Sequence, residues 1–270
     1  MSINSTISKI EQAVQVGVTL KHSWFRGHSK QFGKLVPKVF REEFKHFHHM
    51  KGLEFSLTYE FKRVAPSLQS VVPENKDSQN WLFLMQHHGA PTRLLDWTQS
   101  ILVALFFTVS NDIEEDGEIW ALYPPALNNL SGISSLPTLD NIKLKYLFAE
   151  PSYINNEEEL LKELSLEEKP KYPIALLPPL KFSRMNFQQS AFTIHPKPKK
   201  DNKLTQLLND EKSLICYRIP RESKKEMLYA LRSLGISNHT LFPDLDALSA
   251  HLINEFCTVM SAKPPKPLEF

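Results

Sequence analysis

The chain has 270 residues, of which 41% are apolar and 23% charged, values ordinary for a globular protein and unlike those of a disordered one. Its 32 basic and 30 acidic residues give a net charge of +2, which indicates no dominant nucleic-acid-binding surface and leaves only a local basic patch open. No run of about 18 apolar residues and no amino-terminal leader pattern occurs, so we expect a cytoplasmic protein without a membrane span.

Glycine and cysteine usage argues against several classes of enzyme and against disulfide and metal sites. The chain has 8 glycines and contains neither GxxxxGK[ST] nor GxGxxG, which argues against P-loop enzymes and dinucleotide-fingerprint enzymes. Its two cysteines, Cys216 and Cys257, lie far apart within apolar runs. They are expected to be buried thiols rather than a disulfide, and no ligand spacing for a metal is present.

The first half of the chain is expected to mix short helices with strands. Helices are predicted at residues 4–20 with Ser5 as N-cap, at 52–65, at 80–86 and at 100–110, and strands at 23–27, 92–97 and 118–123. The segment 100–110 is apolar throughout, and a helix is favoured there because Thr98 or Ser100 can cap it. Residues 35–40 and 66–78 are expected to be loops, and Asp116-Gly117 a hairpin-type turn.

The second half continues the mixture. Strands are predicted at 174–178, 192–195 and 214–219, and helices at 223–234, closed by Gly235, and at 244–255. Residues 124–173, with a Glu-rich helix near 156–168, are expected to form an insertion or lid outside the core. A basic loop at 196–201 and a proline-rich tail at 261–270 complete the chain. Without a repeating βαβ spacing, the pattern favours an α+β domain over a doubly wound sheet.

Arg26 is the first candidate for chemistry. It lies at the end of an aromatic strand, where a guanidinium is costly to bury unless it meets an anion or carbonyl groups. Its planar fork suits a phosphate or carboxylate, and Gly27 permits close backbone approach of a ligand. The alternative is a structural ion pair between Arg26 and Asp96.

A second polar segment runs from Gln86 to Trp97. His87 and His88 do not share a helix face, so one is expected to pack and the other to line a pocket rather than chelate a metal together. Arg93 either pairs locally with Asp96 or faces the same pocket as Arg26. In a third segment, Gln188 and Gln189 precede a strand and either cap it or hydrogen-bond a base or a nicotinamide amide.

These segments resemble the FRG domain family. The resemblance rests on four blocks that span about residues 20–255: Trp24-Phe25-Arg26-Gly27-His28-Ser29, Leu84 to Trp97, Arg184 to Ile194, and Leu241-Phe242-Pro243-Asp244-Leu245-Asp246. The second block is the longest and most specific. The resemblance implies one FRG domain over residues 1–260 in a bacterial or phage protein, often found in defence-like contexts. The family often has Gly after the paired glutamines, where this chain has Ser190.

A more distant similarity links the chain to ADP-ribosyltransferases. Those enzymes hold NAD with an Arg or His on an early strand, often next to Gly, and place an acidic catalytic residue on a later strand. The similarity implies a mixed, mainly antiparallel split sheet flanked by helices. This chain has Gln189 where the acid is expected, and a neutral amide cannot stabilise a developing cation as a carboxylate does. Either Glu54 or Asp96 then serves, or the domain binds without catalysis.

The function expected from these features is NAD-dependent ADP-ribosyl transfer or NAD hydrolysis, in a toxin or anti-phage defence effector. Arg26, His88 and Gln189 are the expected catalytic residues. NAD is expected to be held by a larger set: Arg26, Gly27, His28, Thr92, Arg93, Asp96 and Gln188. The main alternative is a nucleotide- or nucleic-acid-binding module that uses Arg26, Arg93 and the loop Lys197, Lys199 and Lys200. A metal-free nuclease with His88 as base is a third reading. No metal is expected, and the acceptor macromolecule stays open.

Overall fold

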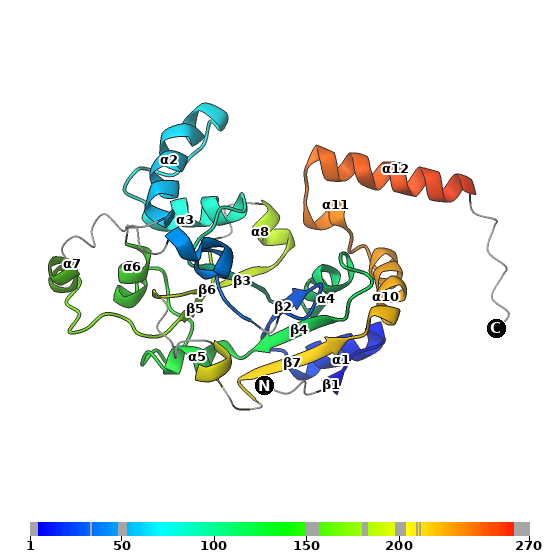
Figure 1. The fold of residues 1–270 in the computed structure, drawn as a ribbon, viewed down its shortest axis with the longest axis horizontal. Coiled ribbons are helices and arrows are strands. Elements are labelled where there is room, and N and C mark those ends of the chain that lie inside the picture. The colour runs from blue at the N-terminus through cyan, green and yellow to red at the C-terminus, as the bar shows by residue number, and fades with distance from the viewer. Residues whose placement is uncertain are drawn as a thin grey trace.

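The computed structural model describes residues 5–32, 34–47, 53–149, 157–179, 183–197, 204–208, 210 and 212–261 (Figure 1). Its centre is one open sheet with the strand order β1-β7-β4-β2-β3-β6-β5. The strands are β1 (Ser5–Thr6), β2 (Trp24–His28), β3 (Leu94–Thr98), β4 (Gly117–Leu122), β5 (Ile174–Leu176), β6 (Ser190–Ile194) and β7 (Leu214–Ile219). Only the β1–β7 pair is parallel. The predicted α+β class with a mixed, mainly antiparallel sheet is therefore confirmed.

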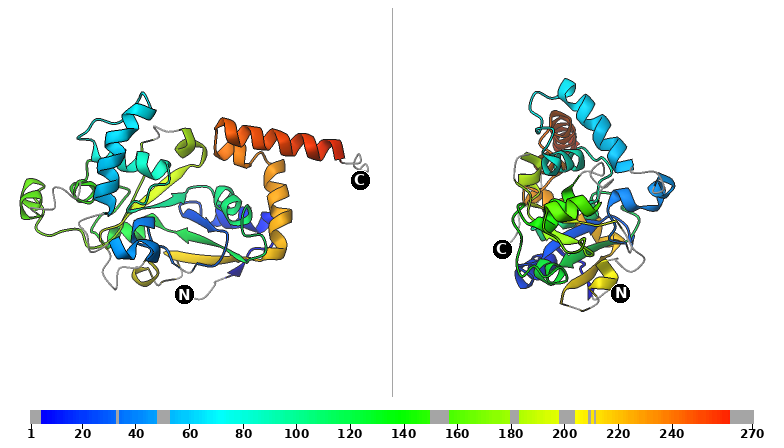
Figure 2. Two further views of the ribbon diagram at one scale, coloured as in Figure 1. Left: turned by 45° about the horizontal axis from the view of Figure 1, so that its top comes forward. Right: turned by 90° about the vertical axis from the view of Figure 1, so that its left-hand side faces the viewer.

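Helices flank this sheet (Figures 1 and 2). The α-helices are α1 (Ile10–Thr19), α2 (Leu53–Leu68), α3 (Ser78–His87), α4 (Ile101–Val109), α5 (Pro124–Asn129), α6 (Ile142–Phe148), α7 (Glu157–Glu163), α8 (Ser183–Phe187), α9 (Leu204–Leu207), α10 (Arg221–Ser233), α11 (Asn238–Leu241) and α12 (Leu245–Ser261). Two 3-10 helices, η1 (Lys38–Phe40) and η2 (Glu42–Phe47), precede α2. No described helix combines the length and apolar character needed to cross a membrane.

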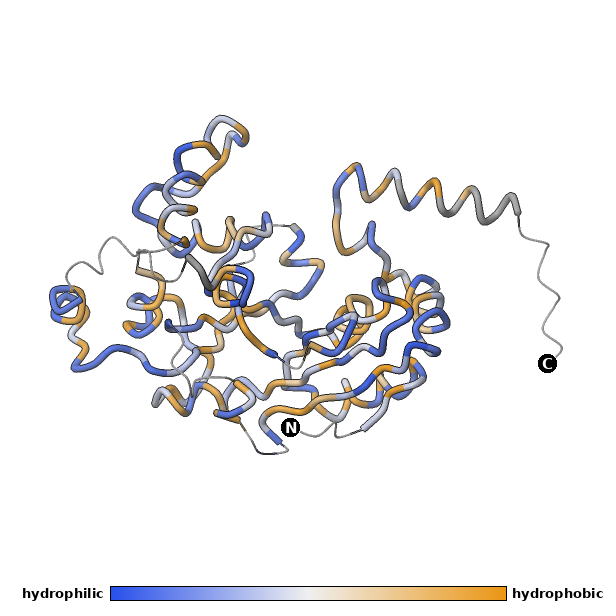
Figure 3. Tube along the Cα trace, viewed as in Figure 1, coloured by the Kyte–Doolittle hydropathy of each residue, from blue (hydrophilic) through white to orange (hydrophobic). Residues whose placement is uncertain are grey.

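Alternation along the strands divides the core between the two faces of the sheet. On one face, Phe25, Ile119 and Ala121 pack against α1, α4 and α10, and further along the same face Leu94 and Phe192 pack against α3 and α6. The other face buries a cluster of tryptophans and aliphatic residues: Trp24, Leu95, Trp97, Trp120 and Leu122. Hydrophobic residues accordingly follow the strands and α4 in Figure 3.

Helix α4 lies unusually close to β2. A Cβ atom added at Gly27 would lie 1.9 Å from the carbonyl oxygen of Ala104 and 2.4 Å from Oγ1 of Thr108. Ser100 caps the helix by accepting a hydrogen bond from the backbone N–H of Val103, as the sequence predicted. The glycine therefore serves the contact between the strand and the helix that covers it.

Several predicted elements need correction. The helix predicted at 4–20 begins only at Ile10, because Ser5 and Thr6 extend the sheet beside β7, and Lys9 rather than Ser5 precedes the first turn. Helix α2 continues into the predicted loop at 66–78 and ends at Leu68, since a proline in its last turn removes only one hydrogen bond near the helix end. Asp116-Gly117 joins α4 to β4 and so makes no hairpin.

The segment 124–173 contributes to the core. Leu127 of α5 and Leu144, Leu147 and Phe148 of α6 are buried against the sheet, because the apolar faces of these helices cover its strands. The expectation of a lid outside the core is wrong for α5 and α6, and whether the segment is an insertion stays a prediction. Most of the basic loop 196–201 and residues 262–270 of the tail lie outside the described residues. Cys216 is buried as expected, and its burial raises the pKa of the thiol to about 12.

Candidate functional site

The sheet is nearly divided between β2 and β3. Strand β2 pairs with β4 over its whole length, but with β3 through the single pair Phe25–Thr98. Where the two strands part, the Arg26 side chain bridges them. Its Nη1 donates a 2.7 Å hydrogen bond to the backbone carbonyl of Asp96. The same nitrogen lies 3.7 Å from the Asp96 carboxylate. An arginine thus joins the two halves of the sheet at the point where their backbone ladder ends.

Two buried residues orient the guanidinium from the other side. Nε of Arg26 donates to Nε2 of His28 at 2.9 Å, and Nδ1 of His28 lies 2.7 Å from the Glu118 carboxylate. Because an arginine nitrogen only donates, Nε2 of His28 accepts, and its proton is on Nδ1, pointing at Glu118. Burial lowers the pKa of His28, an effect only partly offset by the hydrogen bond to Glu118. The imidazole is therefore held neutral, as this contact requires.

The Asp96 carboxylate is positioned by the segment that precedes it. Nε2 of Gln86 donates to Asp96 Oδ2 at 2.8 Å, and the Thr92 hydroxyl donates to the opposite end of the same amide at 2.5 Å. Thr92 also accepts a hydrogen bond from the backbone N–H of Leu94. These contacts fix which end of the amide faces Asp96, whose side chain is 55% exposed beside an Arg26 side chain that is 15% exposed. An accessible carboxylate is thus held next to a mostly buried cation.

Positive charge gathers around this pair. Burial lowers the pKa of Arg26, the Asp96 carboxylate raises it, and nearby Arg41 lowers it further. On α8, Arg184 donates to the carbonyl of His87 at 3.1 Å, and its guanidinium lies 4.3 Å from the centre of the Phe242 ring. Burial lowers the pKa of Arg184 as well, while Asp96 and Asp244 raise it. Two arginines, Arg26 and Arg184, therefore interact with one exposed carboxylate, and Arg41 adds a further positive charge close to Arg26, an arrangement suited to an anionic ligand.

Arg93 is directed away from this cluster. Its backbone N–H and its Nε donate to the Glu54 carboxylate at 3.0 and 2.7 Å, Nη2 is also paired with that carboxylate, and Nη1 donates to the carbonyl of Leu147. The local pair of Arg93 with Asp96 does not form, because α2 supplies a buried acid instead. The side chain of Arg93 fastens α2 and α6 to the start of β3.

His88 ends α3 and its ring lies 6.3 Å from Phe61 of α2 and 4.8 Å from His87. The half-buried neighbour, His87, has its pKa lowered to about 4, mainly by burial and then by His88 and Arg184. No hydrogen bond joins His88 to Arg26 or Asp96 among the described residues. Its catalytic role stays a prediction without a contact to support it.

The paired glutamines lie beyond the end of β3. The side-chain Nε2 of Gln188 donates to the backbone carbonyl of Leu241, and the backbone carbonyl of Gln188 accepts from the Thr98 hydroxyl at 2.7 Å. Gln189 is exposed, has a φ of 46°, and accepts a backbone hydrogen bond from Gln99. These contacts favour the capping alternative for Gln188. Gly27 faces α4, so helix packing rather than a ligand occupies the space beside it.

Residues 21–117 match the family model of the FRG domain. This chain contains an FRG domain. The match includes Arg26, Arg41 and Asp96 and ends one residue before Glu118, while Arg184 lies outside it. No curated protein and no solved structure gives a significant match to the chain.

Three residues of the site were missed by sequence reasoning. Glu118 could have been found from alternation along β4, since it shares a face with Trp120 and Leu122, where an acid needs a partner. Arg184 was visible in the third block of the FRG resemblance. Arg41 carries no sequence signal. Within the described residues, no group of three or more His, Cys, Asp or Glu side chains is placed to hold a metal ion.

Proposed function

We propose that the Arg26–Asp96 site of this FRG domain binds NAD and cleaves its nicotinamide–ribose bond, transferring ADP-ribose to water or to another acceptor. The observation that carries the proposal is an exposed carboxylate held beside a guanidinium whose remaining donors are free. Among the described residues, Nη2 of Arg26 has no hydrogen-bond partner. A guanidinium fork with free donors suits the pyrophosphate of a dinucleotide.

Asp96 is the acid that supports the chemistry best. Cleavage breaks the bond between C1′ of the ribose and the nicotinamide nitrogen, and the bonding electrons leave with the nicotinamide. The positive charge that develops on the ribose is stabilised by a nearby carboxylate. An acceptor oxygen then adds to C1′ and loses a proton. Glu54, the other candidate, is buried and occupied by Arg93, whereas Asp96 is exposed and oriented by Gln86.

The test is nicotinamide release from NAD by purified protein, compared between wild type and Asp96→Asn. Loss of one group that stabilises a transition-state charge slows an enzyme by roughly 100- to 1,000-fold, and we expect that loss for Asp96→Asn. Asp140→Asn is the matched control, because the Asp140 side chain is 94% exposed and, among the residues that the structure describes, pairs only with Lys145, at 3.9 Å. It should leave the rate unchanged.

Wild-type activity that survives Asp96→Asn would remove Asp96 from the mechanism. A wild-type protein that neither binds nor cleaves NAD, but binds DNA with a steep salt dependence, would replace the proposal with the nucleic-acid-binding alternative. NAD cleavage would suit a toxin or anti-phage effector in a bacterial cell, since loss of NAD stops metabolism.

A further inference from the structure

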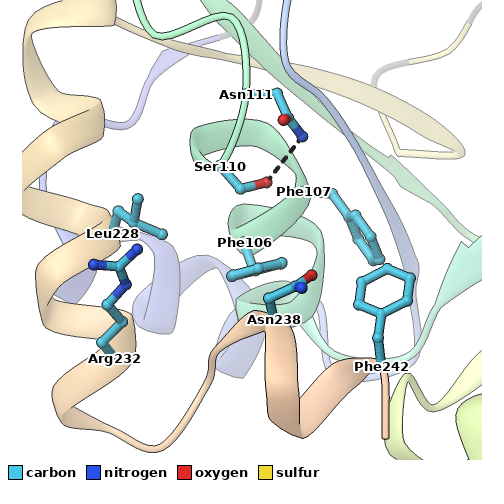
Figure 4. A pocket seen from close by; sticks show the side chains of 8 residues that line it. All are labelled: Phe106, Phe107, Ser110, Asn111, Leu228, Arg232, Asn238 and Phe242. Carbon is cyan, nitrogen blue, oxygen red and sulfur yellow. Dashed lines mark hydrogen bonds between the residues drawn. The ribbon is translucent and has the colours of Figure 1, made fainter. Parts of the chain in front are cut away.

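A cavity of about 360 Å³ lies between the end of α4, the middle of α10 and the start of α11 (Figure 4). Its size falls at the lower end of small-molecule sites, which enclose about 300–1,000 Å³. None of the residues of the Arg26–Asp96 cluster lines it. The cavity is therefore a separate feature, and an inference about it does not depend on the proposed NAD chemistry.

One wall of the cavity is aromatic. Phe107 of α4 and Phe242 after α11 meet edge to face, with ring centres 6.0 Å apart and planes at 86°. Arg184 lies against Phe242 at 4.3 Å and helps to hold that ring in place. Figure 4 shows both rings on one side and Leu228 of α10 on the opposite side. Apolar walls on two sides suit a planar ring between them.

The remaining lining is polar and carries one charge. Asn111 donates to the Ser110 hydroxyl at 3.3 Å, and Asn238 offers a side-chain amide with no hydrogen-bond partner among the described residues. An amide supplies both donors and an acceptor, which suits the edge of a nucleobase. Arg232 is exposed next to Leu228 and makes no ion pair within the described part of the chain. It can therefore hold an anionic group at the edge of the cavity.

We propose that this cavity binds a nucleoside monophosphate. The base lies against Phe107 and Phe242, the amide of Asn238 hydrogen-bonds the edge of the base, and Arg232 pairs with the phosphate. The ligand is held between α4 on one side and the carboxy-terminal helices α10 and α11 on the other, away from the Arg26–Asp96 cluster.

The experiment is isothermal titration of the full chain with AMP, adenosine and inorganic phosphate in parallel. Reversing the charge at Arg232 removes a charge-assisted hydrogen bond, so Arg232→Glu should weaken AMP binding by roughly tenfold or more. Leu228→Trp should abolish it by filling the cavity, and Asn238→Leu should weaken it without changing the phosphate contact. Lys225→Glu is the matched control, since Lys225 is an exposed cation on the same helix outside the cavity. This variant should bind AMP as tightly as wild type does.

AMP binding that is stronger than adenosine binding and that fails in Arg232→Glu and Leu228→Trp supports the proposal. Three results would overturn it: no AMP binding by wild type at millimolar concentration, equal binding of adenosine or of phosphate alone, or AMP binding that is lost in Arg26→Ala but kept in Leu228→Trp. A thermal melt of each variant shows whether it is folded. If Leu228→Trp does not fold, Asn238→Leu takes its place in the test.

Discussion

Arg26 is held between a neutral histidine and a carboxylate, and both contacts depend on protonation. His28 can accept from Arg26 only while its Nε2 carries no proton. Protonation would remove that acceptor and would place a second positive charge beside the guanidinium. The geometry of the site therefore depends on a histidine whose pKa burial keeps below its usual value of 6.5.

Buried neutral histidines predict a loss of stability in acid. Burial lowers the pKa of His195 to about 3 and that of His87 to about 4, below the ordinary value of 6.5. Between pH 6.5 and these values the unfolded chain binds more protons than the folded one, so the free energy of unfolding falls as the pH falls. Each fully buried histidine should contribute a slope of roughly 1.4 kcal/mol per pH unit in that window.

Urea denaturation at several pH values between 7 and 4 measures that slope. His195→Gln removes the titrating ring and should give a shallower profile than wild type, while His22→Gln, at an exposed position, should leave the profile unchanged. Parallel profiles for wild type and His195→Gln would show that the pKa of His195 is the same in the folded and the unfolded chain, and would contradict the prediction.

Gly27 gives a second prediction at the scale of one residue. Gly27→Ala would place a methyl group 1.9 Å from the carbonyl oxygen of Ala104, and relief of that clash requires α4 to move away from β2. Overpacking of this kind costs about 1–3 kcal/mol, and contact with backbone predicts the upper end of that range. Chemical denaturation measures the loss.

The matched control for that substitution is Gly89→Ala. Gly89 has a φ of +76° with no atom within 4 Å of an added Cβ, so alanine there meets only backbone strain of about 1 kcal/mol. Equal losses at the two glycines would show that α4 and β2 are not in the close contact described.

At the scale of elements, one ion pair connects three of them. Glu54 from α2 receives the backbone N–H and the guanidinium of Arg93 at the start of β3, while Arg93 also donates to the last turn of α6. Both side chains are largely buried, with 15% of Arg93 and 8% of Glu54 exposed. Removal of one member leaves the other charge without a partner.

The prediction is a strong coupling between the two residues. Arg93→Met or Glu54→Leu alone should destabilise the protein by about 3–5 kcal/mol, because each leaves a buried charge unpaired. The double variant should lose clearly less than the sum of the two. A double-mutant cycle by chemical denaturation measures the difference, and simple additivity would contradict the pairing.

Local patterns predicted most elements, and tertiary contacts account for the errors. Strand β2 and helix α4 were visible in apolar runs and in the capping Ser100, and the pairing of Arg26 with Asp96 was one of two alternatives drawn from the sequence. The partner of Arg93 was missed because Glu54 lies 39 positions earlier, on a helix whose place beside β3 no local pattern records. The strand at Ser5–Thr6 was missed because β7, its partner, lies at the other end of the chain.

At the scale of the whole molecule, the sheet consists of two parts that meet at one backbone pair and one arginine. The strands β1, β7, β4 and β2 form one part, and β3, β6 and β5 form the other. The Arg26–Asp96 cluster lies where these parts separate. Gln86 of α3 donates to Asp96, and Asp96 raises the pKa of Arg184 on α8. Helix α4 contacts both β2 and β3, and Figure 1 shows these three elements side by side. Ligand contacts to both parts would strengthen a junction that has little backbone hydrogen bonding of its own.

This arrangement predicts that a ligand at the junction stabilises the entire fold. A ligand bound only to the folded state adds about 2.7 kcal/mol of stability at a concentration 100 times its dissociation constant. For a chain of this size, such a gain raises the melting temperature by several degrees.

NAD binding at the Arg26–Asp96 site can be tested by the melting temperature of wild type and Arg26→Ala with and without millimolar NAD. We expect NAD to raise the melting temperature of wild type and of the control Arg63→Ala, because Arg63 is exposed and, within the described part of the chain, pairs with Glu60 of its own helix alone. We expect no rise for Arg26→Ala, which should still unfold cooperatively without NAD. A rise of equal size in Arg26→Ala, or no rise in wild type, would contradict the claim that Arg26 and Asp96 form a dinucleotide site.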